Sequence, residues 1–172
     1  RRRPHGFDAL ARIIVGQQVS TKAASAIATR LSEATGGELS AVAVASTEDE
    51  ALRAAGLSRQ KVRYLRALTD AVMASELVLE QLPELGDDEV IRQITAITGF
   101  GEWSAHMYLM FSLGRTDVWP VGDLAVRMGF GRIMSLEERP TPTAVRQAAE
   151  HLSPYRSALA LLCWKYYSEA PL

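Results

Sequence analysis

The sequence has a single cysteine, Cys163, among its 172 residues. One cysteine cannot form a disulfide within the chain, and it cannot supply the four thiolates of a zinc or iron–sulfur site, so we expect a small buried thiol. Apolar runs are also short, because charged residues or glycines interrupt them well before the ~20 residues that a membrane-spanning helix needs. No signal-peptide pattern opens the chain, and we expect Arg1 to be an arbitrary starting point rather than the natural N-terminus. We therefore expect part of an intracellular protein without membrane association.

Net charge is also small, at −1, which argues against binding of nucleic acid by bulk attraction. The charges are nevertheless unevenly distributed, since residues 1–30 hold six Lys and Arg residues against one acid. The two basic regions consist of Arg1, Arg2, Arg3, Arg12, Lys22 and Arg30, and of Arg59, Lys61, Arg63 and Arg66. Such regions are typical of a phosphate-binding face, and a solvated helix surface explains them equally well.

Apolar residues recur at helical spacing along most of the chain, and sustained period-two alternation is missing, which predicts an all-α fold. Helix boundaries are indicated by capping residues, prolines at first helical positions and one glycine. These signals are a capping box of Thr47 with Glu50, a helix end at Gly56, caps at Ser58 and Asp87, and the pairs Thr141-Pro142 and Ser153-Pro154. With no low-complexity linker, the pattern predicts short helices joined by short turns.

Residues 97–105 read as a helix end, a tight turn and a second helix start. Gly99 and Gly101 allow positive φ and leave no side chain over the turn, so that backbone N–H groups can face an anion such as a DNA phosphate. An ordinary corner between two helices fits this segment equally well, with Gly99 ending one helix and Phe100 filling the core.

Residues 118–127 add a more specific pattern, Val-Trp-Pro-Val-Gly-Asp-Leu-Ala-Val-Arg. The hairpin, the Pro- and Gly-rich segment at residues 120–122 and the single Asp that follows it together resemble the helix–hairpin–helix DNA glycosylase superfamily. Residues 7–10 and 16–20 resemble it as well. Residues 101–105 and the stretch from Ser153 to Trp164 are most similar to its alkylation-repair branch, the type II 3-methyladenine-DNA glycosylases. The resemblance spans almost the whole chain.

This resemblance implies one all-α helix–hairpin–helix glycosylase domain over residues 1–172, with two helical lobes flanking a cleft for DNA and the base. The lobes are expected at about residues 7–113, with the hairpin at 98–101, and at 114–172 together with the N-terminal segment. The implied activity is hydrolysis of the N-glycosidic bond of alkylated bases, such as 3-methyladenine and 7-methylguanine, after base flipping.

Asp123 matches the catalytic Asp of this family. Breaking an N-glycosidic bond builds positive charge on the deoxyribose, so an anion fixed beside C1′ stabilises the transition state more than the ground state. A helix N-cap is a compatible role for the same residue, and Asp117 is the nearest competing carboxylate. The lysine with which bifunctional relatives form a Schiff base is replaced by Trp103, which implies a monofunctional enzyme.

Trp103 and Trp164 fall on family positions that line the base pocket, with Tyr155, Met107 and Tyr108 as neighbours. Aromatic faces attract cationic bases by roughly 0.5–2 kcal/mol, although aromatics at helical spacing are more often core residues. Gln18 aligns with the family's intercalating wedge, and a surface glutamine at a helix end is the alternative. The remaining DNA contacts are expected at the hairpin: Thr98, Gly99, Phe100, Gly101 and Ser104.

Backbone carbonyls of Thr95, Ile97 and Phe100 correspond to those that hold a structural Na⁺ or K⁺ in relatives. No cofactor or catalytic metal is expected, because the three histidines are far apart in the sequence. The expected partner is double-stranded DNA with a damaged base, bound by a monomer, in the cytoplasm or nucleoid of a bacterium or the nucleus of a eukaryote. Two alternatives remain: a glycosylase for deaminated or oxidised bases, and a non-enzymatic helix–hairpin–helix module, which leaves residues 120–123 unexplained.

Overall fold

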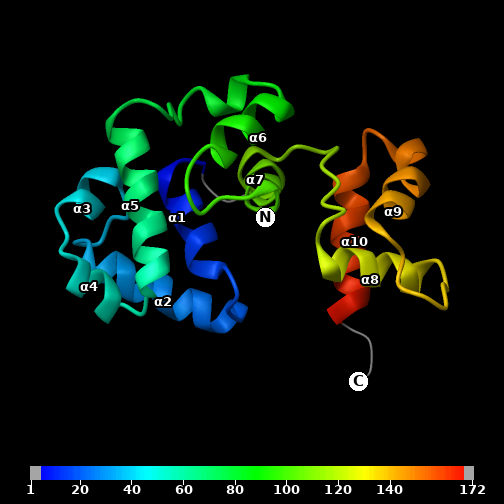
Figure 1. Cartoon of the computed structure of the whole chain (residues 1–172), viewed down its shortest axis with the longest axis horizontal. Helices are drawn as coiled ribbons and strands as arrows, with labels where there is room; N and C mark the ends of the chain where they lie inside the picture. The colour runs from blue at the N-terminus through cyan, green and yellow to red at the C-terminus, as the bar shows by residue number, and fades with distance from the viewer. Residues whose placement is uncertain (1–4, 169–172) are drawn as a thin grey trace. The chain divides into compact units, whose positions relative to one another are not determined.

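The computed structural model describes residues 5–168, and these residues form helices and turns without any strand (Figure 1). The predicted all-α fold is therefore confirmed. The chain divides into two compact units, residues 1–113 and residues 114–172. Within the described part, no helix is both long and apolar enough to cross a membrane.

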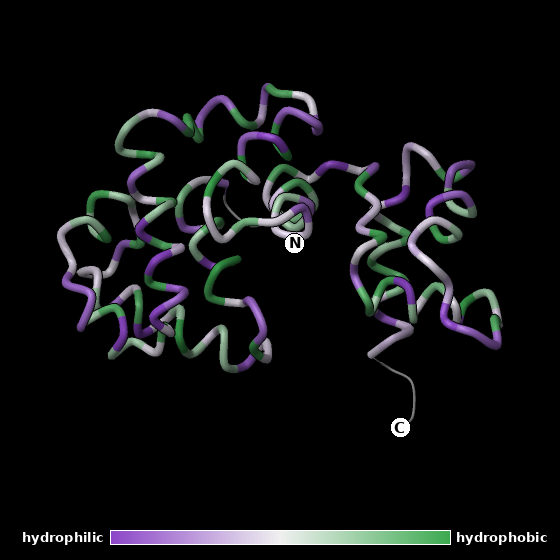
Figure 2. Tube along the Cα trace, viewed as in Figure 1, coloured by the Kyte–Doolittle hydropathy of each residue, from purple (hydrophilic) through white to green (hydrophobic). Residues whose placement is uncertain are grey.

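The first unit is built around α1, Phe7–Gly16, which packs against three other helices, α2, α5 and α7. Its residues Leu10 and Ile14 have no exposed surface, because the helix is apolar on nearly every side. Around it, hydrophobic and hydrophilic residues alternate along the outer helices (Figure 2). The other elements are α2, Thr21–Ala34; α3, Ala41–Ala45; α4, Asp49–Ala54; α5, Arg59–Met73; the 3₁₀ turn Leu82–Glu84; α6, Asp87–Thr95; α7, Glu102–Tyr108; and the π-helical turn Leu109–Leu113.

Local capping explains several of these boundaries. The Ser58 hydroxyl accepts a hydrogen bond from the Lys61 N–H, as predicted for the start of α5. Gly56 follows α4 with φ of 111°, and the N–H of Leu57 reaches back to the Leu52 carbonyl, which is the Schellman pattern of a helix end.

Two predicted caps are wrong. The Thr47 hydroxyl donates to the Ala43 carbonyl at 2.8 Å, so it belongs to the end of α3, and α4 begins at Asp49 without a side-chain cap. Asp87 is the first residue of α6 rather than its cap, which is Gly86. Its carboxylate still lies in the first turn, where the helix dipole favours a negative charge.

The second unit consists of α8, Leu124–Ile133; α9, Pro142–Ala148; the 3₁₀ turn Glu150–Leu152; and α10, Arg156–Ser168. Helices α8 and α10 pack with their backbones in contact at Gly129, where an added Cβ would lie 1.9 Å from the Cys163 carbonyl oxygen. Cys163 itself is fully buried, as expected, and burial raises the pKa of its thiol to about 11. Glycine at position 129 is thus required by the close approach of the two helices.

The sequence predicts two helices in this unit that begin at a proline, and one of these helix starts is confirmed. Thr141 caps α9 through the Ala144 N–H, and Pro142 is its first residue. The other is wrong, since α10 begins at Arg156, two residues after Pro154. The Asp117 carboxylate explains the shift, because it accepts the N–H of Arg156 and thereby caps α10 from a distant loop.

Candidate active site and DNA-contacting surface

The hairpin turn between α6 and α7 depends on Gly99, whose φ is 100°. A Cβ at this position would lie 2.2 Å from Tyr64 Cγ, so the turn admits no side chain. Gly101 has an ordinary φ of −103°, and a Cβ added there would meet no atom within 4 Å. Of the two glycines predicted to need conformational freedom, only Gly99 uses it.

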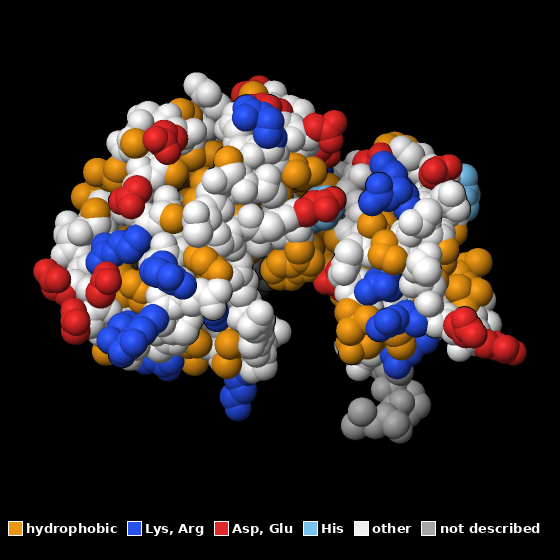
Figure 3. Space-filling view, viewed as in Figure 1, with side chains coloured by type: hydrophobic (Ala, Val, Ile, Leu, Met, Phe, Trp, Pro, Cys, Tyr) orange, Lys and Arg blue, Asp and Glu red, His pale blue; other side chains and the backbone are white. Residues whose placement is uncertain are grey.

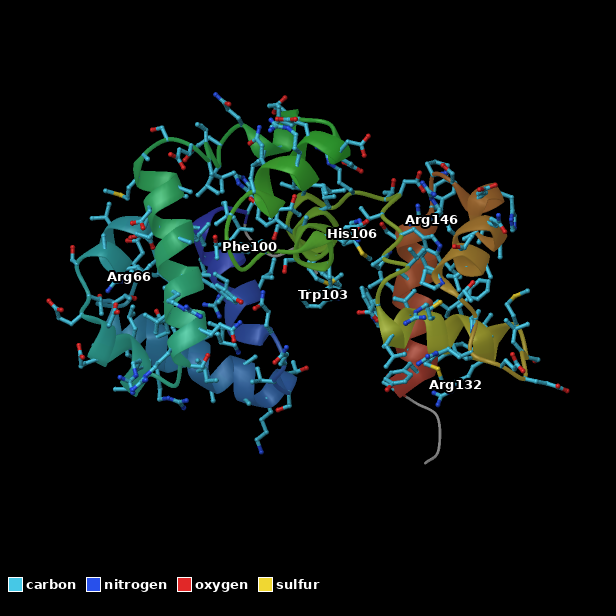
Figure 4. All side chains as sticks on the ribbon, in the orientation of Figure 1. Arg66, Phe100, Trp103, His106, Arg132 and Arg146 are labelled. Carbon is cyan, nitrogen blue, oxygen red and sulfur yellow. The ribbon has the colours of Figure 1, made fainter. Side chains whose placement is uncertain are left out.

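Phe100 and Gln17 anchor the turn to the rest of the first unit. Phe100 is 6% exposed and is part of the core (Figure 4 marks its position). The Gln17 side-chain amide donates a hydrogen bond to the Gly99 carbonyl at 2.9 Å, which ties the end of α1 to the hairpin. Sequence reasoning missed this contact, because a glutamine after a helix end gives no sign of its partner 82 residues away.

A polar pocket of about 350 Å³ lies between the Gln17–Gln18 turn, the start of α5 and the hairpin. Gln18 is exposed there with φ of 55°, a left-handed conformation that is uncommon for residues other than glycine. Four of the predicted DNA-contacting residues meet in this pocket. Its lining is Gln17, Gln18, Ser58, Gln60, Lys61, Tyr64, Gly99, Phe100 and Gly101.

The two remaining predicted DNA contacts lie elsewhere. Thr98 is exposed and lines a separate hollow together with residues of α5 and α6. Ser104 is buried at 3% exposure, and its N–H donates to the Gly101 carbonyl at 2.9 Å within the first turn of α7. Because its side chain is enclosed, Ser104 supports the hairpin and is not part of the exposed surface.

Asp123 is the N-cap of α8, in agreement with the helix start expected there. Its Oδ1 accepts the Val126 N–H at 2.9 Å and the Trp164 Nε1–H at 3.2 Å. Both donors converge on one carboxylate oxygen, so α8 and α10 together fix the orientation of the side chain. Two of the predicted site residues, Asp123 and Trp164, are thereby brought into direct contact.

Trp119 anchors the segment that precedes Asp123. Its indole N–H donates to the Val145 carbonyl at 3.1 Å, and its ring meets Phe130 edge-on with centroids 6.3 Å apart. Trp119 is 8% exposed, so the segment that carries Asp123 is anchored in the hydrophobic core. The motif around residue 119 does not by itself indicate this anchoring role.

Asp117, the competing carboxylate, has a structural role. It forms a two-pronged ion pair with Arg156, at 2.7 and 2.8 Å, and accepts a hydrogen bond from the Ser153 hydroxyl at 2.8 Å. The bond from Arg156 is the main cause that lowers the pKa of Asp117 to about 2. This network ties the loop before α8 to the start of α10.

The residues predicted for the base pocket differ in exposure. Trp103 is 40% exposed in the first turn of α7 (Figure 4), and Tyr155 is 69% exposed. Tyr108 has no exposed surface; its hydroxyl accepts the Gly6 N–H at 3.0 Å, and burial raises its pKa. We therefore correct its assignment from base pocket to core. Met107 is also buried, at 8% exposure.

The predicted cation site rests on backbone carbonyls at the hairpin. The Ile97 carbonyl accepts the Phe100 N–H at 3.1 Å and keeps a second lone pair, so it is compatible with a monovalent cation. In residues 5–168, no group of three His, Cys, Asp or Glu residues can hold a metal ion. His106 is buried on α7, with Nε2 3.6 Å from a Glu102 carboxylate oxygen.

Known proteins share both the sequence pattern and the fold. The family model of the HhH-GPD superfamily base excision DNA repair proteins matches residues 11–154. DNA-3-methyladenine glycosylase 1 of Schizosaccharomyces pombe is 33% identical over 162 residues, which cover 92% of this chain and 71% of the relative.

Two solved structures are similar over nearly the whole chain. The S. pombe 3-methyladenine DNA glycosylase Mag1 in complex with abasic DNA has a TM-score of 0.84 at 33% identity, covering 92% of this chain and 79% of that one. A DNA-3-methyladenine glycosidase from Bacillus halodurans has a TM-score of 0.88 at 36% identity, covering 98% and 78%. With the family pattern matched from α1 to the turn before α10, the chain belongs to the HhH-GPD superfamily of base excision DNA repair proteins.

Proposed function

We propose that this chain is a monofunctional DNA glycosylase that removes alkylated bases, such as 3-methyladenine, from double-stranded DNA. The similar proteins from S. pombe and B. halodurans carry names that specify 3-methyladenine as the base. The observation that carries the proposal is the fixed carboxylate of Asp123, which two N–H donors orient at the start of α8.

Asp123 supplies the negative charge that the reaction needs. As the bond between C1′ and the base nitrogen breaks, its electron pair leaves with the base, and positive charge develops on the deoxyribose. A carboxylate already held in place stabilises that charge without reorganising during the reaction. Water then adds to C1′ and loses a proton to solvent, so the products are the free base and an abasic site in an intact strand.

Trp103 bears on both the mechanism and the substrate. It occupies the position of the lysine in bifunctional relatives, and an indole offers no amine for a Schiff base. Its exposed ring in the first turn of α7 suits it to contact a flipped, cationic base, since aromatic faces attract cations. Trp164 and Tyr155 remain in the proposed set of base-contacting residues, and the buried Tyr108 does not.

Gln18 and the hairpin form the proposed DNA-contacting surface. Gln18 is exposed beside the hairpin, and a side chain there is suited to fill the gap that a flipped nucleotide leaves in the stack. Thr98 and Gly101 are exposed on the turn and are proposed to face a backbone phosphate. We also propose a structural Na⁺ or K⁺ on the carbonyls of Thr95, Ile97 and Phe100, and binding of the duplex by a monomer.

The direct test is base release from a panel of lesion-containing duplexes, followed by alkaline cleavage at abasic sites. We expect cleavage at 3-methyladenine or 7-methylguanine. Cleavage only at hypoxanthine or oxidised bases would change the substrate class. Duplex binding without any base release would replace the proposal with a non-enzymatic DNA-binding module.

A further inference from the structure

Four arginines surround the turn that joins α4 to α5, and we call this group the basic corner: Arg30, Arg53, Arg59 and Arg63. Figure 3 shows Lys and Arg side chains gathered over the end of the first unit where α2, α4 and α5 meet. The second basic region of the sequence contributes two of the four. The other two come from α2 and α4, which the sequence alone does not place beside it.

The turn itself is braced by Arg30. Its Nε donates to the Ala55 carbonyl at 3.0 Å, and its guanidinium covers Gly56, where an added Cβ would lie 2.9 Å from Arg30 Nη2. Arg59 and Arg63 are one helical turn apart on α5, so they share a face of that helix. Together with Arg53 they line a groove of about 530 Å³ between α4 and α5.

The positive charges of the basic corner are not used in ion pairs within the described part of the chain. Across the part of the chain that the structure describes, no carboxylate forms an ion pair with any of the four. Arg66 and Lys61 behave differently: Arg66 binds Asp49 and the carbonyls of Val44 and Thr47, and Lys61 donates to the Val15 carbonyl at 2.7 Å. The basic region 59–66 thus divides into two inward-bound and two outward-facing cations.

The acids of the groove offset only part of this charge. Asp49 is already neutralised by Arg66. Asp70 lies seven residues beyond Arg63 on α5, about 10 Å away along the helix. Glu50 is exposed on α4 and pairs with none of the arginines. The four arginines that line the groove outnumber its three acids, so the groove carries an excess of positive charge in a protein whose net charge is −1.

The basic corner borders the proposed DNA-contacting surface. Ser58, Gln60 and Lys61 follow the same turn and line the pocket that also contains Gln18 and the hairpin. Arg59 and Arg63 project from the neighbouring face of α5 into the groove. A duplex that lies against Gln18 and the hairpin would continue past this corner.

We propose that the basic corner binds backbone phosphates of the duplex that flanks the lesion, an inference that rests on DNA being the partner. Arginine suits this role, since its planar guanidinium matches a phosphate with two parallel N–H donors. Contacts of this kind add affinity without regard to base sequence or damage. The corner therefore extends the binding surface and takes no part in the choice of base.

The test measures binding of undamaged duplex DNA by Arg53→Gln/Arg63→Gln over a series of salt concentrations. Each lost phosphate contact reduces the slope of log K against log salt by about 0.9, so we expect a slope smaller by roughly 2 and weaker binding at every salt concentration. Arg139→Gln/Arg146→Gln removes the same charge from exposed positions of the second unit and is the matched control. Circular dichroism verifies that all variants fold.

Arg53→Lys/Arg63→Lys keeps the charge and is expected to retain most of the slope. The inference is overturned if Arg53→Gln/Arg63→Gln keeps the wild-type slope, or if the control changes the slope equally; an acidic protein would then be the better candidate partner. Because undamaged DNA is used, this result is independent of base release. If the Arg53→Gln/Arg63→Gln variant has a smaller slope but the wild type excises no base, the proposed function is contradicted. The inference on the basic corner is then still supported.

Discussion

The indole Nε1–H of Trp164 donates a hydrogen bond to Asp123 Oδ1 over 3.2 Å, joining two residues 41 positions apart. The resemblance assigned Trp164 to the base pocket alone. The contact gives it a second role, as a positioning residue for the proposed catalytic carboxylate.

Trp164→Phe removes this donor and keeps an aromatic ring. A hydrogen bond to a charged group contributes about 1.5–3 kcal/mol, so we expect a ten- to hundredfold slower single-turnover excision. Binding to abasic DNA should be nearly unchanged, because the loss affects the transition state. Equal excision rates for the variant and the wild type would limit Trp164 to packing or base contact.

Gly99→Ala should destabilise the first unit. The new Cβ would collide with Tyr64, and φ of 100° is strained for any residue with a side chain. We expect a loss of about 1–3 kcal/mol in the free energy of unfolding, measured by urea denaturation. Gly101→Ala is the control, because that position has ordinary φ and open space. A Gly99→Ala protein as stable as Gly101→Ala would contradict the packing of the hairpin on Tyr64.

The hydrogen bonds of Asp117 predict that the stability of the protein falls over a specific acidic pH range. The pKa of Asp117 is lowered to about 2 in the folded protein, mainly by the hydrogen bond from Arg156, against about 3.9 in an unfolded chain. The stabilisation is present above the unfolded pKa and is lost as pH falls from about 4 to about 2. Asp117→Asn should therefore lower stability at pH 7 and flatten its decline over this window. An unchanged decline in unfolding temperature would mean that other carboxylates cause it.

Borohydride added during the reaction should trap no covalent complex with damaged DNA, because position 103 carries an indole in place of an amine. A bifunctional 8-oxoguanine glycosylase assayed in parallel supplies the positive control. A trapped complex with this chain would require another amine nucleophile and a revised mechanism.

Some helix boundaries follow from local sequence signals, whereas the start of α10 depends on a distant group. Ser58 and Gly56 act within their own turns, and both were identified correctly. The cap at Ser153-Pro154 was misplaced because Asp117, 36 residues away from Ser153, determines where α10 begins. Nothing in the local pattern around residue 153 distinguishes the two cases.

The sequence names candidate site residues, but it does not indicate which of them contact one another. The family resemblance proposes Asp123 and Trp164 separately, and only folding of α8 against α10 brings them together. Tyr108 shows the converse, since helical spacing does not distinguish an aromatic that lines a pocket from one that fills the core. Arg30 and Arg53 join the basic corner through tertiary packing, which charge counting along the sequence does not reveal.

We propose that the Asp123 carboxylate carries the chemistry, and Asp123→Asn tests this role most directly. Asparagine is as good an N-cap as aspartate, so the variant should fold with a similar unfolding temperature and bind duplex DNA normally. Its single-turnover release of 3-methyladenine should fall on the order of 100- to 1000-fold, as for loss of a preorganised electrostatic group. Release at the wild-type rate by the folded variant would contradict the account.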